Sequence, residues 1–183
     1  PGRTAHPNAT DLVAQVAAMN AGRYLDGLVG EPTDFCIGVS AYPEKHPESP
    51  SLDHDLTVLK RKQDAGADYA VTQLFYDVDA YLAFVERARD VGVTMPILPG
   101  LKILTTPAQL DLVPRVFGCA IPRALDDAIR SAASAEAAEA AGVSWARMMT
   151  ERLFDAGSPL VHFYVMQNTD ALVRLMGDLG HTR

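Results

Sequence analysis

The chain has 183 residues, of which 48% are hydrophobic and 21% charged, a composition typical of one globular domain with a substantial core. Its formal net charge of −7 comes without a lysine- or arginine-rich block, which disfavours nucleic acid and anionic membranes as partners. No apolar run reaches membrane-spanning length. Cys36 and Cys119 share no metal-ligand spacing, and Cys36 is interpreted as a core residue of an apolar strand, so we expect a cytoplasmic protein.

Residues 1–8 are predicted to form a loop, with Asn8 or Thr10 capping a first helix. Four apolar runs downstream are predicted to be strands: Phe35–Ala41, Tyr69–Phe75, Met95–Leu98 and Leu160–Met166. Helices are predicted after them at 51–65, 78–91, 106–113 and 171–179, with an alanine-rich helix and a second helix, Val143–Phe154, between 122 and 155. The continuous apolar character of Phe35–Ala41 indicates a strand buried on both faces.

Strands that alternate with helices at these intervals predict an α/β protein with a parallel sheet, either doubly wound or part of a (β/α)8 barrel. A whole barrel takes about 250 residues, and the sequence supplies about four β/α units. The preferred interpretation is therefore half of a barrel, forming a single domain over 1–183. The chain begins at Pro1 without methionine, and we expect that an upstream portion is not part of this sequence.

The loop after the first predicted strand carries Glu44, His46 and Glu48, and the helix start beyond it carries Asp53, His54 and Asp55. A metal site has to be considered for this set, although its members lack a recognised ligand spacing. A solvated acidic loop with a helix cap is a second interpretation. A third is a polar ligand that takes a histidine and a carboxylate as hydrogen-bond partners.

Other polar residues lie at positions where ligands bind in parallel α/β proteins. Arg61 and Lys62 are adjacent cations, of which Lys62 shares a helix face with Asp55; they indicate either a solvated face or capture of an anion such as phosphate. Gln73, near the end of its strand, is predicted to contact a ligand, because a buried amide is costly without hydrogen bonds. His162 is interpreted as a core residue of its strand.

The segments AYPEKHPE, LKRKQDAGADYAVTQLFYD, ILPGLK and HFY, in this order, resemble methylenetetrahydrofolate reductase of the short bacterial type. The resemblance covers nearly the whole chain. It implies a (β/α)8 barrel that binds FAD at its C-terminal face. It also implies that NADH or NADPH is used to reduce 5,10-methylenetetrahydrofolate to 5-methyltetrahydrofolate, in one-carbon metabolism and methionine biosynthesis.

Residue by residue, the resemblance implies that FAD is contacted by Tyr42, His46, Ser49, Asp55, Val58, Arg61 and Lys62. It implies that Gln73 contacts both folate and the nicotinamide cofactor, and that Gln109 is a second folate position. The family usually continues HFY with Thr-Leu-Asn and often a basic residue that helps to hold the folate, whereas this chain has Gln167 and Asn168 there. Asn168 is expected to be a third folate position. Val113 stands where some members stack an aromatic ring on the folate.

The resemblance also implies what this chain lacks. The family's glutamate proton donor belongs to the first half of the barrel, with which nothing here aligns, so no catalytic acid is expected in this sequence. Two alternatives to the reductase stay open: a catalytically incomplete flavin- or folate-binding module, and a metal-dependent barrel hydrolase built on His46 and His54. A half barrel leaves a sheet edge and apolar faces uncovered, so we expect a homo-oligomer.

Overall fold

The computed structural model describes residues 6–165 and 169–180. Its helices are α1 (Ala9–Asn20), the short 3-10 helix η1 (Leu25–Gly27), α2 (Leu52–Asp64), α3 (Val78–Asp90), α4 (Pro107–Phe117), α5 (Arg123–Arg130), α6 (Ala135–Asp155) and α7 (Asp170–Asp178). Its strands are β1 (Gly38–Ala41), β2 (Tyr69–Thr72), β3 (Ile97–Leu98), β4 (Gly100–Leu101) and β5 (His162–Phe163). Four of these strands are shorter than the runs that predicted them, whereas β4 lies just beyond the predicted run Met95–Leu98.

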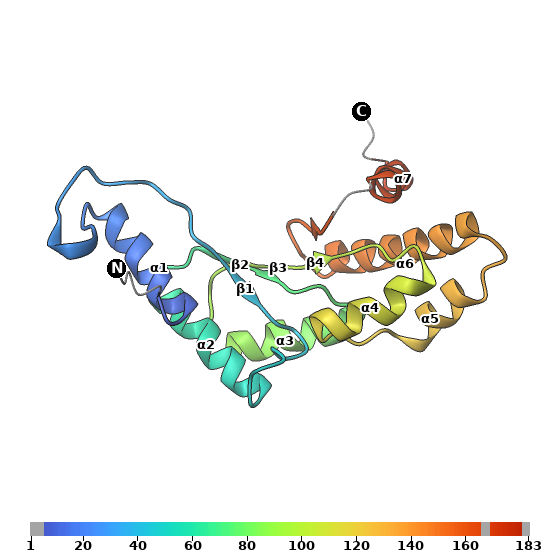
Figure 1. The fold of residues 1–183 in the computed structure, drawn as a ribbon, viewed down its shortest axis with the longest axis horizontal. Coiled ribbons are helices and arrows are strands. Elements are labelled where there is room, and N and C mark those ends of the chain that lie inside the picture. Colours follow the sequence, from blue (N-terminus) through green and yellow to red (C-terminus); the bar gives the residue numbers. More distant parts are fainter. Residues whose placement is uncertain (1–5, 166–168, 181–183) are drawn as a thin grey trace, which may run out of the picture.

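The strands form two parallel sheets, one in the order β1-β2-β3 and one pairing β4 with β5. This confirms the α/β class and the parallel arrangement. The strands of the described residues do not close into a barrel. Figure 1 shows α2 and α3 on one side of the first sheet. The helices α4, α5 and α6 lie together at the end of the molecule opposite α1.

Pro99 separates β3 from β4, a strand that the sequence did not predict. Before it, β3 pairs with β2; after it, the Gly100 N–H donates to the Thr72 side chain, with 2.9 Å between Gly100 N and Thr72 Oγ1. The Pro99 carbonyl accepts a 2.9 Å hydrogen bond from the His162 N–H. A Cβ added at Gly100 would lie 2.2 Å from the Thr72 carbonyl oxygen. The chain therefore bends from one sheet to the other at a position that only glycine fits.

Among the described residues, helices cover the first sheet on one face. On that face, Ala41, Ala70 and Ile97 pack with Leu56 of α2 and Phe84 of α3 in the main hydrophobic core. The apolar faces of α2 and α3 lie against the strands because burial of apolar surface stabilises the fold by roughly 25 cal/mol per Å².

The opposite face of the same sheet presents Ser40, Val71 and Leu98, which are in register across β1, β2 and β3. Ser40 is exposed, and Val71 and Leu98 are half-buried. The prediction of a strand buried on both faces was therefore wrong for β1.

The start of the predicted strand Phe35–Ala41 was also wrong. Phe35 and Cys36 are exposed and precede β1, so Cys36 is not the core residue that was predicted. The cause is local, because the Phe35 backbone is held in a loop by the Asn20 side chain. Asn20 Oδ1 accepts from the Phe35 N–H at 2.9 Å, and Asn20 Nδ2 donates to the Phe35 carbonyl at 2.9 Å.

The helices of the C-terminal half differ from the prediction in extent. α4 continues through Pro114 to Phe117, and α5 was not predicted as a separate helix. The two helices predicted between 122 and 155 are one helix, α6, that runs through Gly142. A Cβ at Gly142 would lie 1.7 Å from the Leu104 carbonyl oxygen. This glycine therefore lets the helix approach the chain closely and does not end it.

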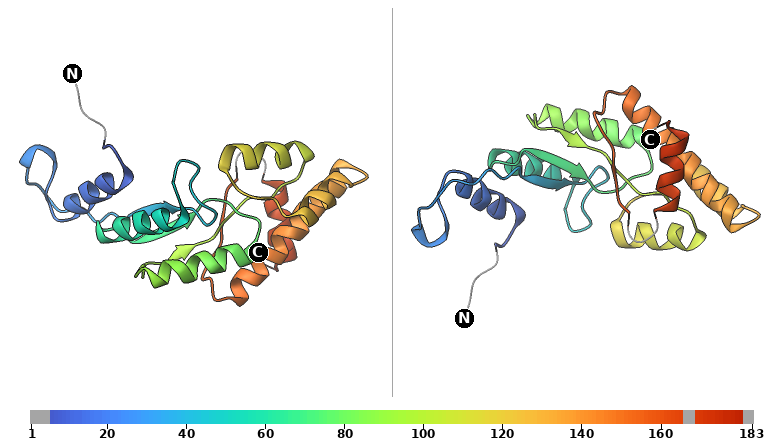
Figure 2. Two further views of the ribbon diagram at one scale, coloured as in Figure 1. Left: turned by 90° about the horizontal axis from the view of Figure 1, so that it is seen from below. Right: turned by 90° about the horizontal axis from the view of Figure 1, so that it is seen from above.

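The molecule is elongated and open. Figure 2 shows α1 and the loop after it at one end, and α5, α6 and α7 at the other. The Asn8 side chain caps α1 by accepting from the Asp11 N–H, as one of the two predicted caps. Among the helices of the described residues, none has the length and apolar character required to span a bilayer.

Candidate functional site

Two cavities lie where the strands end and the loops begin. The first, of about 340 Å³, is lined by residues of β1, the loop after it and α2, including Tyr42, His46, Ser49, Asp55 and Lys62. The second, of about 790 Å³, is lined from the end of β2, from α4 and from the segment around β5, including Gln73, Gln109 and Tyr164. Both cavities therefore stand at the carboxyl ends of parallel strands, where ligand sites of such folds gather.

Lys45 holds the shape of the loop between β1 and α2. Its ammonium donates to the carbonyls of His46 and Ser49 at 2.9 and 2.7 Å, and to that of Pro47 at 3.3 Å. Its φ of 99° is in a region that side chains rarely adopt. Such strain persists only where surrounding contacts enforce it, often at functional sites. Reasoning from the sequence missed Lys45, and its position between prolines gave no signal of this role.

His46 is fixed from both sides of its loop. Its backbone N–H donates to Asp55 Oδ2 at 2.7 Å, which ties the loop to the first turn of α2. Its ring Nδ1 accepts from the Glu48 N–H at 3.1 Å, and the Tyr42 ring meets it edge-on with 4.6 Å between centroids. Because Nδ1 accepts, the neutral ring carries its proton on Nε2, which is left to donate.

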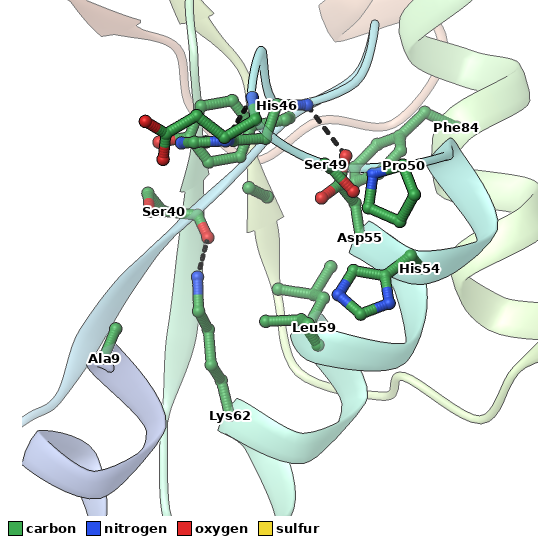
Figure 3. Close-up of a pocket in the computed structure, with 14 residues that line it drawn as sticks. Ala9, Ser40, His46, Ser49, Pro50, His54, Asp55, Leu59, Lys62 and Phe84 are labelled. Carbon is green, nitrogen blue, oxygen red and sulfur yellow. Dashed lines mark hydrogen bonds between the residues drawn. The ribbon is translucent and has the colours of Figure 1, made fainter. Parts of the chain in front are cut away.

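α2 brings a buried cation to the same cavity. Ser51 caps the helix by accepting from the His54 N–H, as predicted, and Lys62 follows in its last turn at only 7% exposure. Its Nζ donates to the Ser40 carbonyl at 2.9 Å, as Figure 3 shows. Burial lowers the pKa of Lys62, and the negative charge of Asp55 opposes that change.

The first cavity brings together most of the residues predicted to contact a flavin: Tyr42, His46, Ser49, Asp55, Val58 and Lys62. Arg61 does not join them, because it is exposed and does not line this cavity. His54 lines the cavity rim and is also exposed. Within the described ranges, no group of three or more His, Cys, Asp or Glu side chains is placed to hold a metal ion.

The second cavity combines two amides with apolar walls. Gln73 follows β2, and its Oε1 accepts from the Leu74 N–H at 3.1 Å, while Gln109 Oε1 accepts from the Thr105 N–H at 2.7 Å. Both side chains thus have fixed oxygens, and among the described residues neither Nε2 has a hydrogen-bond partner. Val113 also lines this cavity at 2% exposure. The predicted folate residue Asn168 lies outside the described residues.

Tyr164 is a site residue that sequence reasoning missed. It lines the second cavity, and its hydroxyl donates to the Thr72 carbonyl at 2.9 Å. His162 is exposed and meets the Tyr164 ring edge-on at 4.6 Å, so its prediction as a core residue was wrong. The reason is that the face of β5 carrying His162 is open. The segment HFY was noticed, but three residues could not show which sheet face each would take.

This arrangement defines an α/β protein with two cavities at the carboxyl ends of its parallel strands, which together form a candidate small-molecule site. The sequence matches the family described as "Methylenetetrahydrofolate reductase" over residues 6–180. The chain therefore belongs to the methylenetetrahydrofolate reductase family, which confirms the resemblance predicted from its motifs.

Individual relatives agree with the family match. The chain is 35% identical over 157 residues to "5,10-methylenetetrahydrofolate reductase" of Salmonella typhimurium, covering 85% of this chain and 53% of that protein. It is 33% identical over 148 residues to "Probable methylenetetrahydrofolate reductase (NADPH)" of Caenorhabditis elegans, covering 80% of this chain and 22% of that protein. The chain thus spans about half the length of its bacterial relative.

A solved structure shares the fold. It is an uncharacterized protein from Clostridium thermocellum that, by its description, binds two copies of 5-methyl-5,6,7,8-tetrahydrofolic acid. It superposes with a TM-score of 0.54 at 21% sequence identity, over 80% of this chain and 54% of the other. At this identity the likeness concerns the fold.

Proposed function

We propose that the protein containing this chain reduces 5,10-methylenetetrahydrofolate to 5-methyltetrahydrofolate with NADH or NADPH, through bound FAD. Family membership over residues 6–180 supports the reaction class. Relatives named for NADPH and for NADH support a nicotinamide co-substrate. The observation that carries the proposal is the pairing of a cavity that combines Lys62 with His46 and Asp55 with a larger amide-bearing apolar cavity on one edge of the strands.

The donor set of the first cavity fits a flavin dinucleotide. Lys62 donates a hydrogen bond to the Ser40 carbonyl, and an ammonium has three donors, so a phosphate oxygen can be bound as well. His46 Nε2 can donate and Asp55 can accept, which suits the hydroxyls of a ribityl chain. When bound, FAD supplies the two-electron carrier between the nicotinamide and the folate.

The second cavity suits ligands that combine a flat ring with amide-like edges. Its walls include Leu112, Val113 and Phe117, and its amides are Gln73 and Gln109. An amide that donates and accepts together can pair with a pterin or with a carboxamide. We infer that Gln73 serves both the folate and the nicotinamide in turn.

The net reaction sets what the protein must do. NAD(P)H loses a hydride and one proton is taken up. One of the two carbon–nitrogen bonds of the folate's bridging methylene breaks. The methylene carbon receives the hydride and becomes a methyl group on the nitrogen that keeps it, and the other nitrogen receives the proton. The described residues contribute binding and orientation in this scheme. We assign no proton donor to them.

Binding and turnover together test the proposal. The full-length natural protein should bind FAD and 5-methyltetrahydrofolate, and should form 5-methyltetrahydrofolate from the methylene substrate, detected by mass spectrometry, only when NADH or NADPH is present. Retention of FAD without product under any of these conditions would favour the flavin-binding module instead. Absence of FAD binding would reject the proposal.

A further inference from the structure

Glu44 links the loop after β1 to the turn after α4. Its Oε2 accepts from the Ala120 N–H at 2.6 Å, although 76 positions separate the two residues in the sequence. Pro47 lies close to the same turn, since a Cβ added at Gly118 would be 3.1 Å from Pro47 Cγ. The loop is thus bonded to the turn through Glu44 and lies close to it at Pro47.

The linked segments form the walls of different cavities. The loop contributes His46 and Ser49 to the first cavity, while α4, which ends at the turn, contributes Gln109 and Val113 to the second. The hydrogen bond of Glu44 is therefore a direct connection between the two proposed ligand sites.

The turn is anchored in the interior. Cys119 is 4% exposed and belongs to the same buried cluster as Leu110 and Val113 of α4. Burial, with the nearby charge of Glu44, raises the pKa of the Cys119 thiol to about 12, so it stays neutral and serves as packing. Because a close-packed interior transmits displacement, a shift of the turn moves the wall of the second cavity.

We propose that Glu44 is a positioning residue that couples the two cavities, so that a ligand in one changes the affinity for a ligand in the other. The identity of both ligands rests on the function proposed above. The coupling acts through the hydrogen bond that joins Glu44, in the loop after β1, to Ala120, in the turn after α4. By linkage the effect is reciprocal, and couplings of this kind are typically about 5- to 150-fold.

Binding measurements on the full-length natural protein test this. The FAD dissociation constant, measured by flavin fluorescence with and without saturating 5-methyltetrahydrofolate, should differ by about fivefold or more in the wild type. Glu44→Ala should bring the ratio close to one. Glu44→Gln should retain most of it, because an amide oxygen still accepts from the Ala120 N–H. The exposed Glu86 of α3 provides the control Glu86→Ala, which should leave the ratio unchanged.

The outcomes separate this inference from the proposed function. Binding of both ligands by the wild type at mutually independent affinities would overturn the coupling alone, as would full coupling in Glu44→Ala. Failure of the wild type to bind either ligand would overturn the proposed function and the coupling with it. If Glu44→Ala does not fold, Glu44→Asp replaces it. The aspartate side chain is one methylene shorter, so it should not reach the Ala120 N–H, and the ratio of the two FAD dissociation constants should again come close to one.

Discussion

The Tyr164 hydroxyl donates a 2.9 Å hydrogen bond to the carbonyl oxygen of Thr72, the last residue of β2. This bond crosses between the two sheets, because Tyr164 follows β5 and Thr72 pairs with β1. Gln73 is the next residue after Thr72, and its own N–H bonds the Ala41 carbonyl at 2.7 Å. The position of the amide in the second cavity therefore depends on contacts with both sheets.

Tyr164→Phe should reduce the free energy of unfolding by about 1 kcal/mol, because it removes one hydrogen bond and leaves the Thr72 carbonyl with one partner fewer. Urea denaturation measures this. Tyr69→Phe is the matched control, since Tyr69 lies on β2 and its hydroxyl makes no hydrogen bond among the described residues. Equal losses in both variants would show that the Tyr164 bond contributes nothing specific.

Gln73→Ala should lower folate turnover much more than flavin content. Its contrast is Gln63→Ala: Gln63 Oε1 accepts from the N–H groups of Thr94 and Met95 at 2.6 and 2.9 Å, joining α2 to the segment before β3. That variant should lower stability and leave the folate KM of the folded fraction unchanged. Flavin content, KM and unfolding midpoints of both variants decide the matter. Parallel losses of flavin and turnover in Gln73→Ala would mark Gln73 as structural.

Lys62→Met should weaken FAD binding by about 10- to 100-fold, since a hydrogen bond to a charged group contributes roughly 1.5–3 kcal/mol. Lys60→Met tests the same change on the outer side of α2, where Lys60 pairs with Asp64 in an exposed i,i+4 ion pair. That pair contributes little, so FAD affinity should stay as in the wild type. Equilibrium dialysis would measure both. Unchanged affinity in Lys62→Met would remove this lysine from the flavin site.

Glu44 gives a pH dependence with a definite sign. Its burial, together with the charge of Asp77, raises the pKa of the carboxyl above its ordinary value of 4.5, although the bond from Ala120 opposes this. The folded state therefore favours the protonated form. This contribution to stability is fully present below the pKa of the unfolded chain and is lost as pH rises through the folded pKa.

Glu44→Gln does not titrate at this position, so the difference in melting temperature between wild type and variant should move against the wild type as pH rises from about 4.5. Thermal unfolding followed by circular dichroism at a series of pH values measures the difference. A difference that is constant with pH, or that moves in favour of the wild type, would contradict the assigned direction.

Local patterns predicted the elements well where helix caps and apolar stripes agree. Ser51, Leu56 and Lys62 took the positions on α2 that the sequence indicates, because their spacing fixes a helix face. The placement of Gln73 at a strand end also followed from the order of strand, loop and helix. These predictions needed no knowledge of distant parts of the chain.

What failed depended on contacts distant in sequence. Cys36 is exposed because Asn20 holds the chain beside it in a loop, and α6 continues through Gly142 because the Leu104 backbone passes close to it. The partnership of Glu44 with Ala120 spans 76 positions. No period or motif in one segment encodes which other segment will lie against it, so these features appeared only with the fold.

The most direct test of the central claim is the stoichiometry of the reaction catalysed by the purified full-length natural protein loaded with FAD. We predict one 5-methyltetrahydrofolate formed for each NADH or NADPH oxidised, and no product after the flavin is removed. Oxidation of the nicotinamide without methyl-folate formation, or product formed equally well by the flavin-free protein, would contradict it.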